Sequence, residues 1–459
     1  MRKFGSVRRG LDHFVMAQSF LSCDRGQAML LPASVAEWLP VGHLARFVVE
    51  VVERLDLAAF YAVYRADGSG RPAHDPAMMV ALVLYNYAVG VRSSRAIERR
   101  CVEDVACRFV AANRAPDHVT INRFRGRHQQ ALSGLFAEVL ALCAQAGMVR
   151  VGTVAVDSTK LAADASLGAN RTYEGLQAEA RRIFEEAAAI DAAEDELYGD
   201  KRGDELPDEL ADPKTRRARI KELLEELEAE RDRARAEHDA KRAAYEQAAR
   251  TGRRPPGRPP GPGLPQQQRA LFARKVNVTD PDSAIVSDRG KLIQGYNVQA
   301  AVADGQVIVA ATATAVATDH GQLVAMVTAA REQLAAAGIE ERVEQVLADS
   351  GYWNVAQVSE LQHGGLDVLV QPRPYKPDSR VKRTHPLAEQ MAEKLTAPDG
   401  AADYRRRQQI VEPVFAHIKH LRGITRMLRR GRVAVQAEID LIATSHNLLK
   451  LYRAAPQAG

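Results

Sequence analysis

Apolar residues recur at helical spacing over most of residues 35–145, which predicts an all-helical region. Asp75 followed by Pro76 is typical of a helix cap and first helical position, and the apolar run MMVALVLYNYAVG after them predicts a buried helix. Further helices are expected from Ser93 through the run ending in CRFV, and from Asp117 to Gly147.

After Gly147 the pattern becomes that of strands. VRVGTVAVDS predicts a first strand that ends at Asp157, and residues 290–350 predict two strands joined at Gly305, a helix and a fourth strand. Asp319, with Gln322 three residues on, is expected to cap that helix, and a final helix is expected from about residue 403. This order predicts an α/β fold with a mixed sheet and flanking helices.

The two strand-forming parts are separated by a charged segment. Residues 172–250 are rich in charge, with an apolar seam through Leu223 and Leu227, and a proline- and glycine-rich stretch follows. This pattern predicts an inserted helical hairpin or coiled coil with a linker. The expected division is residues 1–147 as a helical domain, 148–169 with 269–455 as the α/β domain, and 170–268 as the insertion.

Composition narrows the class of protein. The 459 residues are 46% hydrophobic and 26% charged, and no apolar run is long enough to span a membrane. The basic N-terminus lacks the apolar run of a secretory signal, so a cytoplasmic protein with four reduced cysteines is expected. The 12 His and four Cys lack zinc-ligand spacing, which disfavours a zinc enzyme.

Positive charge gathers in two regions. Residues 1–150 contain 19 Lys and Arg against 13 Asp and Glu, and residues 371–432 contain 15 against 6. A polyanion partner or a solvated basic face would account for either region. Within the first region, five polar and basic residues near the start of one helix suit a recognition helix in a DNA major groove, the alternative being a basic surface helix: Thr120, Asn122, Arg123, Arg125 and Arg127.

Three acids are candidates for chemistry. Asp157 and Asp349 each follow an apolar strand, and Glu412 lies in the final helical segment. Carboxylates at the carboxyl ends of strands can converge on one crevice and hold two hard divalent cations. Taken singly, an Asp after a strand is more often a turn or helix cap.

The surroundings of Glu412 strengthen the set. Residues seven apart share a helix face, so Glu412 and Lys419 project together, and Arg422 and Arg426 continue that face. A carboxylate followed by cations can hold a metal and grip a DNA backbone beside it. An amphipathic helix with mixed surface charge is the alternative.

The spacing of Tyr404, Arg407, Glu412 and Lys419 resembles the signature Y-x2-R-x3-E-x6-K of DDE transposases from bacterial insertion sequences. The segments VDSTK, ADSGY and IVEPVFAHIKH, with DPAMMVALVLYNYAVG and TINRFR, are most similar to the insertion sequence 1182 group. The resemblance covers nearly the whole chain. The inserted segment is its least family-like part.

The resemblance implies an RNase H-like catalytic domain. Asp157, Asp349 and Glu412 would hold two Mg²⁺ or Mn²⁺ ions, while Tyr404, Arg407 and Lys419 would contact phosphates. Lys160 is a further candidate for a phosphate contact because it follows Asp157 closely. The implied partners are the terminal inverted repeats of the element, target DNA and a second copy of the chain, associated with the nucleoid of a bacterial cell. A nuclease that does not transpose and a catalytically inactive DNA-binding descendant remain alternatives.

The chain departs from the signature at one point. Four residues rather than three separate Arg407 from Glu412, which on a regular helix turns Arg407 away from the shared face. Pro413 also lacks the N–H that would bond to Gln409. We therefore expect a kink, a π-bulge or a helix start within residues 408–413 that returns Arg407 to the site.

Overall fold

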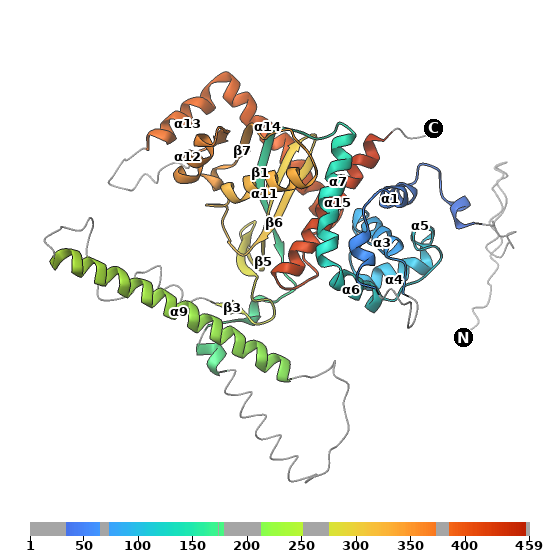
Figure 1. Ribbon diagram of the computed structural model, residues 1–459, viewed down its shortest axis with the longest axis horizontal. Helices are drawn as coiled ribbons and strands as arrows, with labels where there is room; N and C mark the ends of the chain where they lie inside the picture. The colour runs from blue at the N-terminus through green and yellow to red at the C-terminus, as the bar shows by residue number, and fades with distance from the viewer. Residues whose placement is uncertain are drawn as a thin grey trace, which may run out of the picture.

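The computed structural model describes residues 34–64, 73–172, 174–178, 213–250, 275–372 and 385–455. Its architecture is α/β, with one mixed sheet, helices packed around it and a helical region on one side (Figure 1). In the described residues no helix is long and apolar enough to cross a membrane. The proline-rich stretch after residue 250 and residues 179–212 lie outside the described residues, as does Cys23.

The helical region confirms the helical pattern of the sequence. It contains α1 (Leu44–Val52), α2 (Ala58–Tyr61), α3 (Pro76–Ala88), α4 (Ser94–Glu103), α5 (Val105–Val110), α6 (His118–Arg127) and α7 (Gln129–Gln145). Asp75 caps α3 through the Met78 amide with Pro76 at the first position, and α3 is buried on nearly all sides, as predicted. Two of the expected helices are each broken in two, at Asp104 and at His128.

A six-stranded sheet forms the centre of the molecule. Its strands are β1 (Arg150–Ala162), β4 (Ala284–Asp288), β5 (Lys291–Asp304), β6 (Val307–Thr314), β7 (Gln345–Ala348) and β8 (Asp367–Val370), while β2 (Asn170–Arg171) and β3 (Val276–Asn277) form a separate pair. β5 lies antiparallel to β1, β4 and β6, whereas β7 lies parallel to β1 and β8. The hairpin turn between β5 and β6 uses Gly305 and Gln306, both with positive φ.

Helices of the second half complete the layers around the sheet. They are α11 (Leu323–Ala336), α12 (Val355–His363), α13 (Pro386–Thr396), α14 (Pro398–Ala416), a π-helical turn (His417–Leu421) and α15 (Arg432–Ala454). α7 and α15 run side by side between the sheet and the other helices of the first region (Figure 1).

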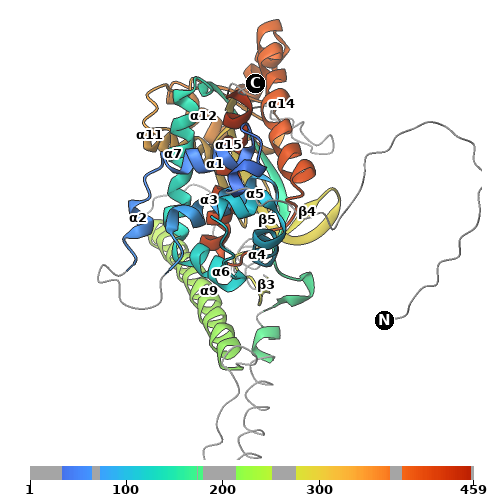
Figure 2. The ribbon, with the colours of Figure 1, turned by 90° about the vertical axis from the view of Figure 1, so that its right-hand side faces the viewer.

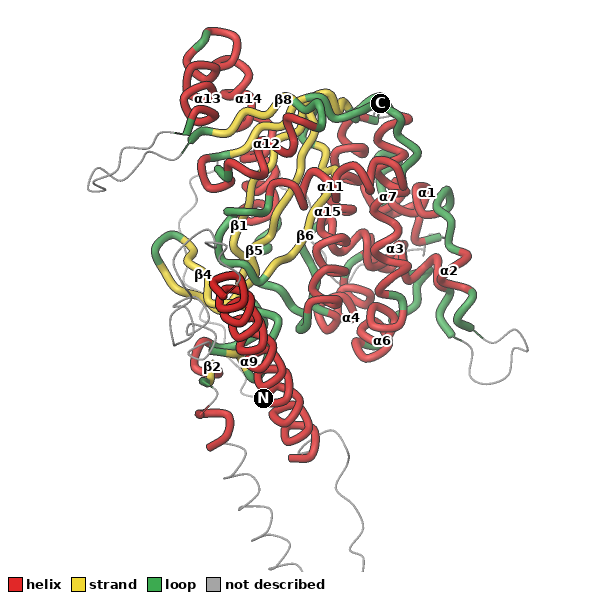
Figure 3. Tube along the Cα trace, turned by 60° about the vertical axis from the view of Figure 1, so that its left-hand side comes forward, coloured by secondary structure: helices red, strands yellow, loops and turns green. Residues whose placement is uncertain are grey.

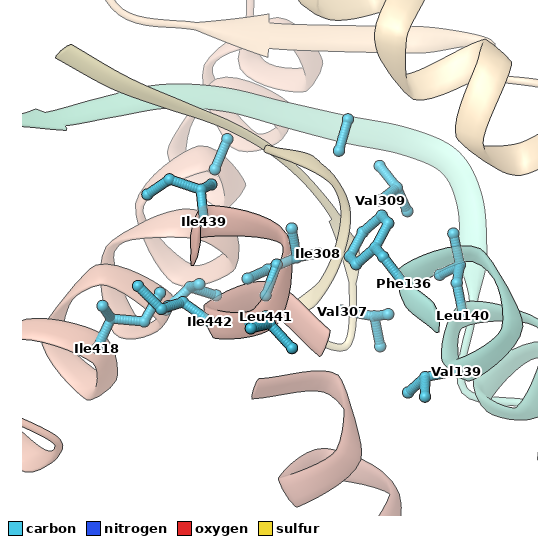
Figure 4. Packing of buried hydrophobic residues seen from close by; sticks show 14 of the residues in the cluster. Phe136, Val139, Leu140, Val307, Ile308, Val309, Ile418, Ile439, Leu441 and Ile442 are labelled. Carbon is cyan, nitrogen blue, oxygen red and sulfur yellow. The ribbon is translucent and has the colours of Figure 1, made fainter. Parts of the chain in front are cut away.

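A single apolar core joins the helical region to the sheet. Phe136, Val139 and Leu140 of α7 pack with Ile308 of β6 and Ile442 of α15 (Figure 4). Burial of such side chains contributes about 1.5–3 kcal/mol each. Since the two parts share this core, the structure does not separate them at residue 147. The division of residues 1–147 from the α/β part stays a prediction.

The inserted segment is described mainly by one helix. α9 (Pro213–Arg250) extends away from the sheet (Figure 3), and the small buried cluster of Leu176, Leu227 and Val276 lies beside the β2–β3 pair. The helical character of this segment agrees with the sequence. The hairpin or coiled coil stays a prediction, because its other arm falls largely outside the described residues.

Candidate active site at the end of the parallel strands

The strand that carries Asp157 is longer than the sequence suggested. β1 continues to Ala162, so the expectation that it ends at Asp157 was wrong; residues 157–162 stay extended because they pair with β5. The parallel pairing with β7 does stop there, at Val156 and Ala348. Asp157 therefore lies at the carboxyl end of the parallel pair, although it is in the middle of its own strand.

Asp349 lies next to Asp157 in this register. It directly follows β7, as predicted. Asp157 and Asp349 are each the next residue after the paired residues Val156 and Ala348, so the two acids lie on neighbouring strands and on the same face of the sheet. The Asp349 carboxylate accepts a hydrogen bond of 2.8 Å from the amide of Gly351, and this bond begins the short turn Ser350–Tyr352.

Arg407 links the third acid to the first. Its guanidinium lies 3.0 Å from the Asp157 carboxylate and 4.0 Å from that of Glu412, and only 12% of its side chain is exposed. The Glu412 side chain is 56% exposed, so it borders the site from the solvent side. Tyr404, one turn before Arg407, is half-buried, and burial raises the pKa of its hydroxyl.

The helix reaches this geometry without the expected break. α14 runs unbroken from Pro398 to Ala416, and the irregular turn comes later, at His417–Leu421, so the prediction of a break within residues 408–413 was wrong. Where Pro413 supplies no N–H, the Gln409 carbonyl accepts a 3.2 Å hydrogen bond from the Gln306 side chain. Arg407 thus comes within ion-pair distance of both acids from a continuous helix.

The electrostatics show that the site has a surplus of negative charge. Burial raises the pKa of Asp157 to about 6, the Ser158 amide and Arg407 lower it, and the charges of Asp349 and Asp319 raise it again. Asp349 has no cationic partner within hydrogen-bonding reach in the described part of the chain. A carboxylate pair held in this way is suited to a hard divalent cation with oxygen ligands. No group of three or more His, Cys, Asp or Glu side chains in the described residues is arranged to hold a metal ion.

Asp319 is a fourth acid that the sequence analysis misassigned. The expectation that it caps α11 was wrong: the N-cap position is Gln322, and the first amide of the helix, that of Leu323, donates to the Gln357 side chain (3.1 Å). The Asp319 carboxylate instead accepts hydrogen bonds from Asn297 (2.9 Å), Gln299 (2.8 Å) and Lys160 (3.2 Å). Asn297 and Gln299 alternate along the buried part of strand β5, and this polar pair was the available signal for a buried partner.

This polar cluster adjoins the carboxylates, since a Cβ atom added to Gly351 would lie 2.8 Å from an Asp349 oxygen and 3.3 Å from an Asp319 oxygen. Side chains alternate along a strand, so Asp157 faces α14 while Ser158 and Lys160 face the other side. Lys160 also donates to Ser158 and Asn297, and the Tyr352 hydroxyl donates to Gln299. Lys419 donates to the Lys160 carbonyl (2.9 Å) and lies 3.6 Å from Asp288, at the hairpin next to the end of α14 (Figure 2). The two lysines are thus fixed near the acids.

Two of the expected DNA-contacting arginines are buried instead. Arg125 is 5% exposed and donates to the Tyr87 hydroxyl and the Arg92 carbonyl. Arg422 is 7% exposed and donates to Ser445 and the Tyr87 and Ile442 carbonyls. The Arg125 guanidinium joins α6 to α3 and to the loop before α4, and that of Arg422 joins the π-helical turn to α3 and α15. Their burial corrects their assignment as DNA contacts.

The remaining expected DNA contacts lie at or near the surface. Asn122, Arg123 and Arg127 of α6 are exposed, and Thr120 is partly exposed and bonds to the helix cap Asp117. Arg426 is 53% exposed and lies 3.2 Å from Asp164.

Comparison with known families gives two matches. A model described as Transposase domain (DUF772) matches residues 33–127, and one described as Transposase DDE domain matches residues 266–448, which include Asp349 and Glu412. No curated protein and no solved structure matches the chain. The chain belongs to the DDE-type transposases, enzymes whose substrate is DNA. The pairing of these two models is consistent with the insertion sequence 1182 group.

Proposed function

We propose that this protein cleaves DNA at the ends of an insertion sequence and joins the freed 3′-hydroxyl to target DNA, with Asp157, Asp349 and Glu412 as the catalytic acids. The observation that carries the proposal is the meeting of Asp157 and Asp349 at the end of the β1–β7 pair, with Arg407 spanning Asp157 and Glu412. A transposase needs such a group of acids at one place.

The proposed fold of the catalytic part is RNase H-like. Support comes from the order of strands β6–β5–β1–β7–β8, with the first three antiparallel and the last three parallel, and from the position of the acids at the centre of that order. The carboxyl ends of parallel strands are where ligands of α/β sheets bind.

The acids are proposed to hold two Mg²⁺ or Mn²⁺ ions. When bound, such ions activate the attacking oxygen and stabilise the leaving oxygen of a phosphodiester. Asp157 and Asp349 would supply ligands from the sheet, and Glu412 from α14. In the structure the Arg407 guanidinium lies between the Asp157 and Glu412 carboxylates. If these carboxylates bound cations, the guanidinium would move away from them and turn toward the scissile phosphate.

Other residues of the site bind and orient the substrate in this proposal. Lys160 and Lys419 would neutralise phosphates beside the cut, and Asp319 holds Lys160 in place. Tyr404 would contact the backbone next to Arg407. In each step one P–O bond breaks as the attacking oxygen forms another in line with it, so no covalent enzyme intermediate is needed. Two DNA ends must be paired for joining, which makes a homodimer the proposed working assembly.

The test uses labelled DNA that carries the inverted repeats flanking the gene, with Mg²⁺. The wild-type protein is expected to leave a 3′-hydroxyl at the element end, whereas D157N, D349N and E412Q bind the same DNA and leave it uncut. Asp367→Asn is the matched control, because Asp367 is an acid that begins strand β8, at the other end of the parallel pair. Cleavage by D349N at the wild-type rate would overturn the proposal.

A further inference from the structure

The segment from Arg422 to Arg432 is the most basic irregular stretch of the described chain. It contains five arginines and no acid, and it joins the π-helical turn to α15. Arg422 is buried against α15. The other four, Arg426, Arg429, Arg430 and Arg432, lie at or near the surface.

Buried polar groups hold the backbone of this segment in place. Glu438 of α15 is 1% exposed; it forms an ion pair of 2.5 Å with Arg92 and accepts hydrogen bonds from the amides of Leu428 (2.9 Å) and Arg429 (3.1 Å). Arg92 also donates to the Arg426 carbonyl at 2.6 Å. The arginines are therefore presented from a fixed backbone, which lowers the entropy lost when they bind a ligand.

One end of the segment lies beside the end of strand β1. The amide of Met427 donates to the carbonyl of Ala162 at 2.7 Å, and Ala162 is the last residue of the strand that carries Asp157. Arg426 and Arg430 lie 3.2 Å and 2.9 Å from the single carboxylate of Asp164, so one positive charge of this trio is not neutralised.

The other end of the segment lies against α6. A Cβ atom added to Gly126 would be 3.8 Å from the Arg429 guanidinium, and Arg123 and Arg127 are exposed on the same helix. A cleft of about 750 Å³ follows between the first turns of α7 and α15. Arg127 and Arg432 line it together with Gln129, Gln130, Ser133 and Gln436, and none of its lining residues is acidic.

We propose that these residues form an arginine track, consisting of Arg123, Arg127, Arg426, Arg429, Arg430 and Arg432, that carries a DNA duplex from the carboxylates to α6. The inference rests on the proposed function. One guanidinium group can donate two parallel hydrogen bonds to the oxygens of one phosphate. The amide and hydroxyl side chains that lie among these arginines supply further donors. The track joins the end of the basic region 371–432 and the basic helix α6 into one surface, although about 300 residues of chain separate them.

The test measures binding of the full-length protein to a labelled duplex of arbitrary sequence by fluorescence anisotropy over a range of salt concentrations, without divalent cations. R127A/R432A is expected to weaken binding at low salt about tenfold and to reduce the slope of log K against log salt by about 2, close to 0.9 for each phosphate that is no longer neutralised. R127K/R432K is expected to keep most of the slope, and the variants should unfold at the wild-type temperature.

The matched control is R331A/R342A. These two arginines line a different cleft, beside α11 and the start of β7, and their removal changes the net charge equally. An unchanged slope in R127A/R432A, or an equal decrease in the control pair, would overturn the track. Failure of the proposed function would appear separately, as cleavage retained by the acid variants, because binding without divalent cations does not depend on those acids.

Discussion

At the scale of single residues, Arg407 has the central place in the site. It is the one cation within ion-pair distance of both Asp157 and Glu412 among the described residues, and Asp157 keeps a raised pKa even beside it. The guanidinium therefore stabilises a group of acids that would otherwise repel each other, in the place where cations are proposed to bind.

Replacing Arg407 by Ala should make the protein more dependent on divalent cations. The substitution leaves Asp157 and Asp349 without a compensating charge, so the metal-free protein is expected to unfold at a lower temperature and to gain more stability from Mg²⁺ than the wild type does. Thermal unfolding with and without Mg²⁺ measures both effects. An equal gain in the two proteins would show that Arg407 and the cation do not share a site.

Asp319 shows why residue roles were only partly predictable. Its position before a helix suggested a cap, since acids commonly serve there, but nothing local in the sequence reveals that Asn297, Gln299 and Lys160 converge on it. Asp157, Asp349 and Glu412 could be singled out because they follow apolar strands or lie in a family-like helical segment, and their catalytic role stays a prediction. The burial of Arg125 and Arg422 was not predictable, because it depends on how α6 and the π-helical turn pack against α3 and α15.

At the scale of elements, long periodic segments were predicted well and their ends poorly. Apolar patterning and turn residues predicted α3 and the β5–β6 hairpin. Strand β1 extends beyond its predicted end because its pairing with β5 continues past Asp157. Strands β4 and β8 were not predicted; β8 has only four residues. The helix break expected near Pro413 is absent, since a side chain from the β5–β6 turn satisfies the freed carbonyl.

The contact between the π-helical turn and α15 predicts a pH dependence. Burial lowers the pKa of His417 to about 4 and that of His446 to about 3, so the folded protein keeps both rings neutral. Both folded values lie below the unfolded value of about 6.5, so the unfolded chain takes up protons first as pH falls. This contribution to stability is full above about pH 6.5 and is lost progressively down to about pH 3.

The measurement is chemical denaturation of wild type and H446Q between neutral pH and pH 5. The wild type should lose about 1 kcal/mol per pH unit more than the variant, because one such group binds one proton on unfolding. Parallel curves for the two proteins would contradict the assignment. The comparison with the variant removes the contribution of the carboxylates, which both proteins share.

At the scale of the whole molecule, the helical region and the sheet region behave as one folded body in this structure. They share the core of α7, β6 and α15, and the buried pair Arg92–Glu438 connects α15 to the loop before α4. Removing one member of a buried ion pair typically costs about 3–5 kcal/mol because the other charge is left unpaired.

Glu438→Ala should therefore lower the free energy of unfolding by about 3 kcal/mol or more. It also removes the acceptor for the Leu428 and Arg429 amides, so DNA binding is expected to weaken together with stability. R92M/E438M should recover part of the stability, since no buried charge remains, without recovering the arrangement of the loop. Recovery of full DNA affinity in that double variant would show that the loop does not depend on Glu438.

The most direct measurement of the central claim is strand cleavage by Asp349→Cys on element-end DNA with Mg²⁺ and with Mn²⁺. If Asp349 is a metal ligand beside Asp157, the thiolate should abolish cleavage with Mg²⁺, which prefers oxygen ligands, and Mn²⁺, which accepts sulfur more readily, should restore a measurable part of it, while D349A stays inactive with both ions. Equal cleavage by D349C and the wild type with Mg²⁺ would contradict the account.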